Sequence, residues 1–353
     1  MKKIGIVTIY NSNYGNRLQN YALQCFLEKM DYNVSTIKNV SLLNKYKNNF
    51  DYFLRNIKFL FKKNDFIDTK KRELLFQQFN KNINTTKYVF NWWRKDKTND
   101  FDQFVIGSDQ VWNPYIGRLS LFDVAEFTNK KVISYAASIG ASSLEKDYLD
   151  ILESKLKKLD AISVREEQGK VLLKEKCNLN SDVLIDPTML LTSKEWEQVM
   201  QRPKQYTDEK YILNYFLGDM DLNYKKMINS YANKNNLKVI NILDRDDPYY
   251  ITGPGEFLFL EKNAEIIFTD SFHSSVFAIL FDRPFVIFER NQLNHNNMGS
   301  RIDTLLNKFK LTERKFNNNM KIEDYIYHNY DEAYKILDAE RKKSEEFLKN
   351  NLE

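Results

Sequence analysis

The stretch Glu265-Ile-Ile-Phe-Thr-Asp-Ser-Phe-His-Ser-Ser-Val-Phe-Ala-Ile-Leu280 decides the fold that we predict for the chain. Its first five residues form a short apolar run, which is typical of a buried parallel strand. Polar residues follow, and then apolar residues return at helical spacing, so the stretch predicts a strand, a tight turn and a helix. Asp270 or Ser271 is the expected N-cap, because either side chain can accept a hydrogen bond from a backbone N–H of the first turn.

His273 is expected in the first turn of that helix, at the carboxyl end of the strand. Open α/β sheets bind ligands at this edge, a helix N-terminus favours an anion, and an imidazole exchanges protons near neutral pH. A second strand, Pro284–Phe288, follows, and a further helix opens at Gly299-Ser300-Arg301. The stretch therefore predicts an anion site around His273, although a histidine that only caps a helix gives the same pattern.

Composition indicates a soluble protein with two domains. The chain has 353 residues, more than one hydrophobic core usually serves, and 42% of them are hydrophobic. Its net charge of +5, from 53 basic and 48 acidic residues, is too balanced for a nucleic-acid binder. Cys25 and Cys177 have no metal-ligand spacing and suit a reduced protein. Met1–Val7 lacks the features of a secretory signal, and no apolar run reaches membrane-spanning length, so a cytoplasmic location with at most peripheral membrane contact is expected.

The first 200 residues predict a Rossmann-like domain. A strand at Ile4–Ile9, a polar turn and a helix from Arg17 open it. The turn lacks the G-x-G-x-x-G pattern, so a dinucleotide is not indicated. We expect the backbone amides of Gly15 and Asn16, with the guanidinium of Arg17, to hold a small anion or a sugar hydroxyl. A glycine that only permits the turn, beside a solvated arginine, is the alternative.

Residues 41–80 predict a helical, basic insertion. Apolar residues recur at helical spacing between Phe50 and Phe61, and lysines and arginine lie between them. This pattern favours a helix that packs on a core while its basic side chains are solvated. Contact of the stripe with an anionic membrane surface is the alternative.

The loop after the predicted strand Phe101–Gly107 has the most distinctive composition of this half. Polar groups and one aromatic ring gather in it, at Ser108, Asp109, Gln110, Trp112 and Asn113. Such a combination is typical of a site for a carbohydrate or another small polar ligand. The alternative is an Asx turn with the tryptophan in the core.

Arg165 follows the predicted strand Ala161–Val164, again at a strand-to-helix turn. An arginine at this edge suits bidentate binding of a carboxylate or phosphate, and an ion pair with Glu166 that only fixes the turn is the alternative. Asp186-Pro187-Thr188 ends the last predicted strand of the domain.

The second half repeats the alternation of strands and helices over residues 209–329, which predicts a second Rossmann-like domain. Strands at Tyr211–Leu217 and Leu237–Leu243 precede the stretch quoted above. Residues 330–353 form a charged helix that is expected to return to the N-terminal domain.

Six motifs, taken in order, resemble the polysaccharide pyruvyl transferase family. They are Asn13-Tyr-Gly-Asn-Arg-Leu-Gln-Asn-Tyr-Ala-Leu-Gln24, Gly107-Ser-Asp-Gln-Val-Trp-Asn113, Ser163-Val-Arg-Glu166, Asp186-Pro-Thr188, Thr269-Asp-Ser-Phe-His273 and Ser300-Arg-Ile-Asp303. The resemblance implies an α/β fold of two Rossmann-like domains that face a cleft, similar to the GT-B glycosyltransferase fold. It implies transfer of a pyruvyl group from phosphoenolpyruvate to two hydroxyls of one sugar, as a ketal on a cell-surface polysaccharide or its precursor. The acceptor would be a free or lipid-linked saccharide, and no cofactor or metal is required.

The resemblance also assigns chemical roles. Asp109 falls on the acid of the N-terminal loop, Arg165 on an anion-binding arginine, and His273 on the histidine of the C-terminal helix turn. Ketal formation protonates a methylene carbon and deprotonates a sugar hydroxyl, so it needs an acid and a base. Asp109 is the expected base and His273 the expected acid or the partner of the phosphate, and the two roles could be exchanged.

The donor carries a carboxylate and a phosphate, so its site needs cations and oriented N–H groups. Arg165, Arg301 and the helix opening with Asp270, Ser271 and Ser274 are expected to supply them. Some family members have an arginine two positions before the histidine, where this chain has Ser271. Arg301 or Arg17 would then have to provide that charge.

Two other functions fit the same architecture. A GT-B-type glycosyltransferase would bind a nucleotide sugar in the C-terminal domain, with its diphosphate near Ser271–Ser275. A carbohydrate-binding protein without catalysis would bind sugar whether or not His273 is present. A nucleoside diphosphate that protects the protein thermally would favour the first, and turnover of neither donor would favour the second.

Overall fold

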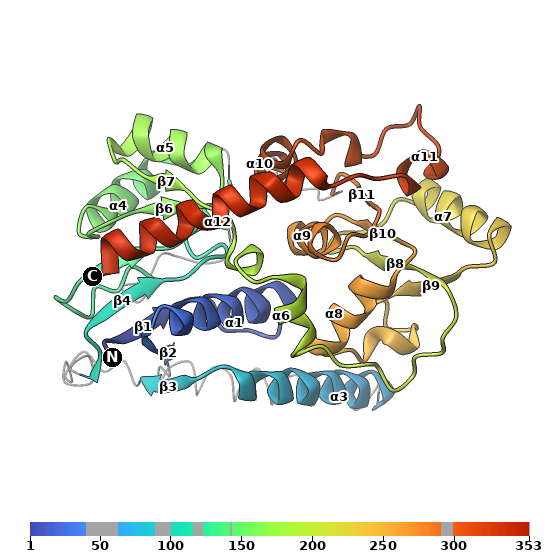
Figure 1. Ribbon diagram of the computed structural model, residues 1–353, viewed down its shortest axis with the longest axis horizontal. Coiled ribbons are helices and arrows are strands. Elements are labelled where there is room, and N and C mark those ends of the chain that lie inside the picture. The colour runs from blue at the N-terminus through green and yellow to red at the C-terminus, as the bar shows by residue number, and fades with distance from the viewer. Residues whose placement is uncertain (40–62, 89–99, 116–122, 142, 291–298, 353) are drawn as a thin grey trace. The chain divides into compact units, whose positions relative to one another are not determined.

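The computed structural model describes residues 1–39, 63–88, 100–115, 123–141, 143–290 and 299–352, so the predicted stripe at 50–61 lies outside the described residues. The chain divides into two compact units, and each has its own parallel sheet (Figure 1). Unit 1 comprises Met1–Lys70, Asn80–Leu190 and Glu340–Glu353, and unit 2 comprises Lys71–Phe79 and Leu191–Ala339. The α/β class with two Rossmann-like units is confirmed.

Unit 1 contains a five-stranded parallel sheet in the order β3-β2-β1-β4-β5. The chain adds β2 and β3 on one side of β1 and then returns to add β4 and β5 on the other. The carboxyl ends of β1 and β4 therefore form a topological switch point, where open sheets bind ligands. The strands are β1 (Lys3–Val7), β2 (Asn33–Asn39), β3 (Thr85–Tyr88), β4 (Gln103–Ile106), β5 (Val132–Ser134) and a separate pair, β6 (Ser163–Val164) and β7 (Asp182–Val183).

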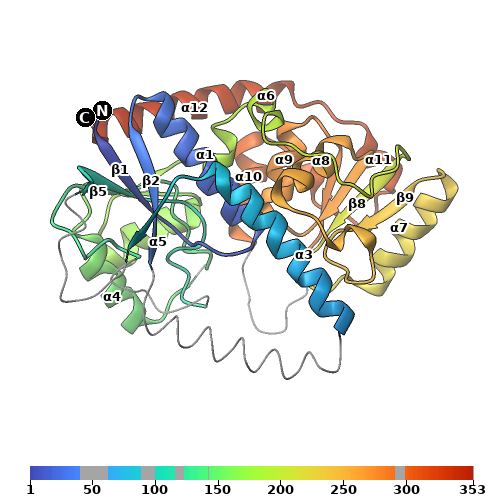
Figure 2. The ribbon, with the colours of Figure 1, turned by 90° about the horizontal axis from the view of Figure 1, so that it is seen from below.

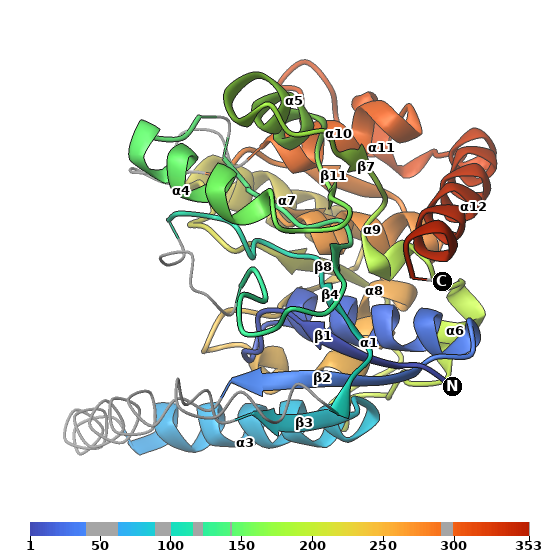
Figure 3. The ribbon, with the colours of Figure 1, turned by 90° about the vertical axis from the view of Figure 1, so that its left-hand side faces the viewer.

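Helix α1 packs beside β2, as Figure 3 shows. It starts at Tyr14 rather than at Arg17, because the side chain of Asn13 accepts a hydrogen bond from the backbone N–H of Asn16 at 3.3 Å. The helical segments of unit 1 are α1 (Tyr14–Lys29), the start of α3 (Lys63–Phe79), η1 (Asn80–Asn82), α4 (Lys146–Leu156), α5 (Glu167–Cys177), η3 (Pro187–Met189) and the end of α12 (Asp331–Leu352).

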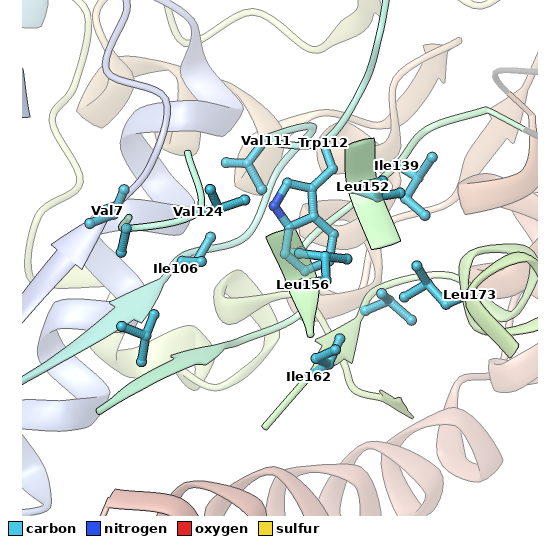
Figure 4. Close-up of a cluster of buried hydrophobic side chains, with 14 of the residues drawn as sticks. Val7, Ile106, Val111, Trp112, Val124, Ile139, Leu152, Leu156, Ile162 and Leu173 are labelled. Atoms are coloured by element: carbon cyan, nitrogen blue, oxygen red, sulfur yellow. The ribbon is translucent and has the colours of Figure 1, made fainter. Parts of the chain in front are cut away.

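The core of unit 1 surrounds Trp112, whose side chain is fully buried. Its ring lies among Val124, Leu152 and Leu156 (Figure 4). The structure thus shows the alternative given above, a core tryptophan, and the prediction that this ring walls a ligand site is wrong. A large ring in a polar loop gives the same sequence pattern in both cases.

Unit 2 contains a four-stranded parallel sheet in the order β11-β10-β8-β9, with its switch point at the carboxyl ends of β8 and β10. Helix α7 lies beside β9 (Figure 2). The strands are β8 (Tyr211–Tyr215), β9 (Lys238–Asn241), β10 (Ile266–Thr269) and β11 (Phe285–Ile287). The helical segments are α6 (Ser193–Glu197), α7 (Leu222–Lys234), η4 (Pro248–Tyr250), α8 (Pro254–Asn263), α9 (Phe272–Leu280), α10 (Ser300–Phe309), η5 (Thr312–Arg314), α11 (Ile322–Ile326), the end of α3 and the start of α12.

Within the described part of the chain, no helix combines the length and the apolar character needed to cross a membrane.

Candidate functional site

The switch point of unit 1 brings the residues after β1 next to the residues after β4, because Val7 pairs with Ile106 at the ends of the two strands. The hydroxyl of Thr8 donates to the carbonyl oxygen of Ser108 at 3.1 Å, and Gln19 of α1 donates to that hydroxyl at 3.0 Å. All three residues are buried. Helix α1 and the loop after β4 are therefore joined at this edge of the sheet.

A buried ion pair between Arg165 and Asp186 lies at the same edge. Nη1 of Arg165 donates to Oδ2 of Asp186 at 2.5 Å, and the side chains are 1% and 0% exposed. The hydroxyl of Ser108 donates to the same oxygen at 3.0 Å, and Thr188 donates to the other oxygen through its backbone N–H and its hydroxyl. Burial opposes the charge on Arg165, but Asp186, Asp109 and Glu166 outweigh it and raise the pKa of the guanidinium.

Asp109 lies on the other side of Arg165, with 3.6 Å between Nη2 of the arginine and Oδ1 of the aspartate. Its backbone is in the left-handed region at φ +72°, which is unfavourable for a residue other than glycine. The carbonyl of Asp109 accepts from the N–H groups of Val111 and Ser138, which fix this conformation. Strain of this kind is concentrated at functional sites, and here it holds a carboxylate against a buried guanidinium.

Arg17 is fully buried, so the alternative of a solvated arginine is wrong. Its Nη2 donates to the carbonyl oxygen of Ile9 at 2.8 Å, and its guanidinium carbon lies 3.6 Å from the centroid of the Tyr10 ring. Burial lowers the pKa of Arg17 to about 10, with Tyr10 and Asp109 acting in the opposite direction. Its Nε and Nη1 have no hydrogen-bond partner among the described residues. A buried cation with two such nitrogens is costly unless a ligand completes it.

Gly15 and Asn16 lie in the first turn of α1 and not in the predicted polar turn. The N–H of Asn16 donates to Oδ1 of Asn13 in the helix cap, and the expectation that this amide holds a ligand stays a prediction. The side-chain Oδ1 of Asn16 is buried and has no partner within the described segments. An acceptor and the donors of Arg17 thus lie in consecutive positions of one helix turn.

The remaining polar residues of the loop after β4 bind one another. Asn113 donates through Nδ2 to Oε1 of Gln110 at 2.8 Å, and both side chains are buried. The charge of Glu166 helps to raise the pKa of Arg165, while its side chain also bonds a neighbouring segment. Oε1 of Glu166 accepts from the hydroxyl of Ser138 and from the N–H groups of Ile139 and Gly140. This carboxylate therefore fixes the segment that runs beside Asp109.

The switch point of unit 2 is organised by Asp270, and of the two predicted N-caps of α9, Asp270 and Ser271, the second holds the position. Oδ1 of Asp270 accepts from the N–H of Leu217 at 2.7 Å, and its Oδ2 accepts from the N–H of Gly218 at 2.9 Å. Arg290, which follows β11, donates through Nε to Oδ2 at 2.9 Å and through Nη2 to the main-chain oxygen at 3.0 Å. Ser271 occupies the N-cap position without a side-chain capping bond. We did not predict Arg290, although it follows a predicted strand just as Arg165 does.

His273 lies in the first turn of α9 and is 8% exposed. The neighbouring Ser274 is fully buried, and its hydroxyl donates to Oε1 of Glu261 in α8 at 2.6 Å. Burial raises the pKa of Glu261 well above its ordinary value. Ser274 was predicted to contact a ligand, but its hydroxyl is hydrogen-bonded to Glu261 inside unit 2. Arg301 lies in the first turn of α10 and is also buried.

The predicted residues thus gather at two sheet edges. Unit 1 brings together Arg17, Ser108, Asp109 and Arg165, and unit 2 brings together Asp270, Ser271 and His273. Among the described residues, no group of three or more His, Cys, Asp or Glu side chains is placed to hold a metal ion.

The model of the family described as polysaccharide pyruvyl transferase matches residues 13–292, which is most of the chain. The chain belongs to the polysaccharide pyruvyl transferase family. Arg17, Asp109, Arg165, Asp270 and His273 of this family member fall within the matched range, and Arg301 lies outside it. No curated protein matches the chain.

Solved structures with little sequence identity are similar to the chain. A glycosyltransferase from Rickettsia africae is 10% identical with a TM-score of 0.50, and the match covers 100% of this chain and 98% of that one. A UDP-GlcNAc 2-epimerase from Neisseria meningitidis, bound to UDP-GlcNAc, is 14% identical with a TM-score of 0.48, and the match covers 99% of this chain and 100% of that one. The fold of this family member is similar to the GT-B fold.

Proposed function

We propose that the protein transfers the pyruvyl group of phosphoenolpyruvate to two hydroxyls of one sugar. The acceptor is a free or lipid-linked saccharide on the cytoplasmic side of the membrane, and the product is a cyclic ketal. Family membership supports a transferase of this kind. The observation that carries the choice of donor is the buried guanidinium of Arg17, whose Nε and Nη1 lack partners among the described residues. A small oxyanion matches those two donors in charge and geometry.

The reaction balances without a further reactant. A proton adds to the methylene carbon of the donor, and one sugar hydroxyl forms a C–O bond to the adjacent carbon. The second hydroxyl forms another C–O bond to that carbon while the bond to the phosphate oxygen breaks. The two hydroxyl protons are taken up by the methyl group and by the released phosphate.

Each reacting group has a proposed partner. Arg17 binds an oxyanion of the donor, and Asp109 accepts the proton of an attacking hydroxyl. Arg165 holds Asp109 in place and adds positive charge beside it, since its Nη1 is committed to Asp186. His273 supplies the proton for the methylene carbon, or neutralises the phosphate.

Incubation with phosphoenolpyruvate and a panel of hexose acceptors tests the proposal. Inorganic phosphate and acceptor mass are followed together. We expect phosphate release that depends on one acceptor, and a product whose mass exceeds the acceptor by one pyruvic acid less one water. A parallel incubation with UDP-sugars examines the alternative. Turnover there, with phosphoenolpyruvate left intact, would show that the protein is a glycosyltransferase.

A further inference from the structure

Arg290 is fixed at the switch point of unit 2 by two hydrogen bonds to Asp270, which together are called the fork below. Its Nε bonds the carboxylate of Asp270 at 2.9 Å, and its Nη2 bonds the main-chain oxygen of the same residue at 3.0 Å. The side chain of Arg290 is 16% exposed, and that of Asp270 is 1% exposed. The guanidinium is therefore held in one orientation at the carboxyl ends of β8 and β10.

Asp270 has hydrogen-bond partners other than Arg290, so holding Asp270 in place does not by itself require the arginine. The carboxylate already accepts two backbone hydrogen bonds, from Leu217 and Gly218. The two hydrogen bonds to Asp270 use Nε and Nη2, so Nη1 is not committed to Asp270. A Cβ at Gly218 would lie 2.7 Å from Cγ of Arg290 and 3.2 Å from Oδ2 of Asp270, so only a glycine leaves room for the pair.

The fork also places the cation beside the opening of α9. The bond to the main-chain oxygen of Asp270 puts Nη2 next to Ser271, which is the N-cap residue of α9. His273 lies in the first turn of that helix. A helix N-terminus, an imidazole and a guanidinium whose Nη1 is not committed to Asp270 therefore occupy one edge of unit 2. All three favour an oxyanion.

We propose that Arg290 binds an oxyanion of the phosphoenolpyruvate donor through Nη1, with Asp270 as the residue that positions it. The inference rests on the proposed function, because the identity of the donor comes from there. Arg290 then supplies, at unit 2, the positive charge that Ser271 does not. Neither Arg17 nor Arg301 then has to replace the arginine that some family members have where this chain has Ser271.

Kinetics of Arg290→Ala and Arg290→Lys test the inference, with Arg202→Ala as the matched control. Arg202 belongs to the same unit and pairs with an exposed Asp208 at 2.9 Å. We expect Arg290→Ala to raise KM for phosphoenolpyruvate by about tenfold or more, since a charge-assisted hydrogen bond is lost. KM for the acceptor stays within about twofold. Arg290→Lys gives an intermediate value because an ammonium lacks the fork, and Arg202→Ala behaves as the wild type.

A double variant distinguishes two roles of Arg290, which are binding the donor and neutralising the carboxylate of Asp270. Arg290→Ala leaves a buried carboxylate without its cation, so thermal unfolding is measured for every variant. In Asp270→Asn with Arg290→Ala that charge is gone, and we expect KM for phosphoenolpyruvate to remain raised. A return of this KM to the wild-type value, or no change in Arg290→Ala, would overturn the inference while the proposed function stands. A wild-type protein that neither binds nor consumes phosphoenolpyruvate would overturn both.

Discussion

Arg17 is fully buried, yet two of its guanidinium nitrogens have no partner among the described residues. Folding therefore retains a charge at some cost, although its pKa of about 10 still leaves it protonated at neutral pH. Natural proteins accept such a cost where function requires it. Arg165 is different, because Asp186 and Asp109 surround it with negative charge. Under the proposed function, Arg17 binds the donor, and Arg165 holds the loop that carries Asp109.

Arg17→Met is expected to abolish donor binding with little effect on the fold. The loss of the bond to the Ile9 carbonyl and of the contact with the Tyr10 ring is offset by removal of a buried charge. The free energy of unfolding should therefore change by less than about 1 kcal/mol. Urea unfolding and calorimetric titration with phosphoenolpyruvate measure the two effects. Wild-type donor affinity in this variant would remove Arg17 from the site.

Asp186→Asn is expected to destabilise unit 1 by about 3–5 kcal/mol, because it leaves the buried guanidinium of Arg165 without its closest counter-charge. The exposed pair Lys234–Glu323 gives the control, since its side chains are 72% and 47% exposed. Lys234→Ala should cost about 1 kcal/mol or less. Equal effects of the two substitutions in denaturant unfolding would argue against a buried, tightly coupled pair.

At the scale of elements, the strands and helices around His273 could be predicted closely because their apolar runs are unambiguous. The run Glu265–Thr269 becomes β10, and the helix after it begins at Phe272. β3 was not predicted, because Thr85–Tyr88 contains no apolar run and is defined by backbone pairing with β2. An edge strand of this kind leaves almost no trace in a sequence.

The places of the candidate site residues in the fold could be predicted, but their contacts could be predicted less well. Asp109, Arg165 and His273 could be found because they follow strands at the ligand-binding edge. Their partners come from distant parts of the chain, as Asp186 does for Arg165, and spacing does not reveal them. The helix α1 starts before the predicted position, because Gly15 and Asn16, which the polar composition assigns to the turn, lie in its first turn.

The contact between α8 and α9 carries a pH dependence that can be measured. Burial raises the pKa of Glu261 above its ordinary value of 4.5, so the folded state binds this proton more tightly than the unfolded state does. Its contribution to stability is complete below pH 4.5 and is lost as pH rises through the folded pKa. Glu261→Gln keeps a hydrogen-bonding side chain facing Ser274 and removes this loss.

Urea unfolding of the wild type and of Glu261→Gln at several pH values tests this linkage. We expect the difference in unfolding free energy to shift in favour of the variant as pH rises from about 4.5 to 8. Two parallel pH profiles would mean that Glu261 has the same pKa in the folded and unfolded states.

At the scale of the whole molecule, two parallel sheets each present a polar edge at their switch point. The edge of unit 1 holds Arg17, Asp109 and Arg165, and the edge of unit 2 holds Asp270, His273 and Arg290. The cleft that the sequence predicts between two domains stays a prediction. Membership of the pyruvyl transferase family supports a transferase, and we propose that these two edges supply the residues for its chemistry.

The most direct test of pyruvyl transfer is the reaction with phosphoenolpyruvate and a hexose acceptor in deuterium oxide, followed by NMR of the product. Protonation of the methylene carbon predicts a ketal whose methyl group carries one deuterium, formed in the same amount as inorganic phosphate. A sugar acceptor recovered without a ketal while phosphoenolpyruvate remains intact, or one extended by a sugar from a nucleotide donor, would contradict it.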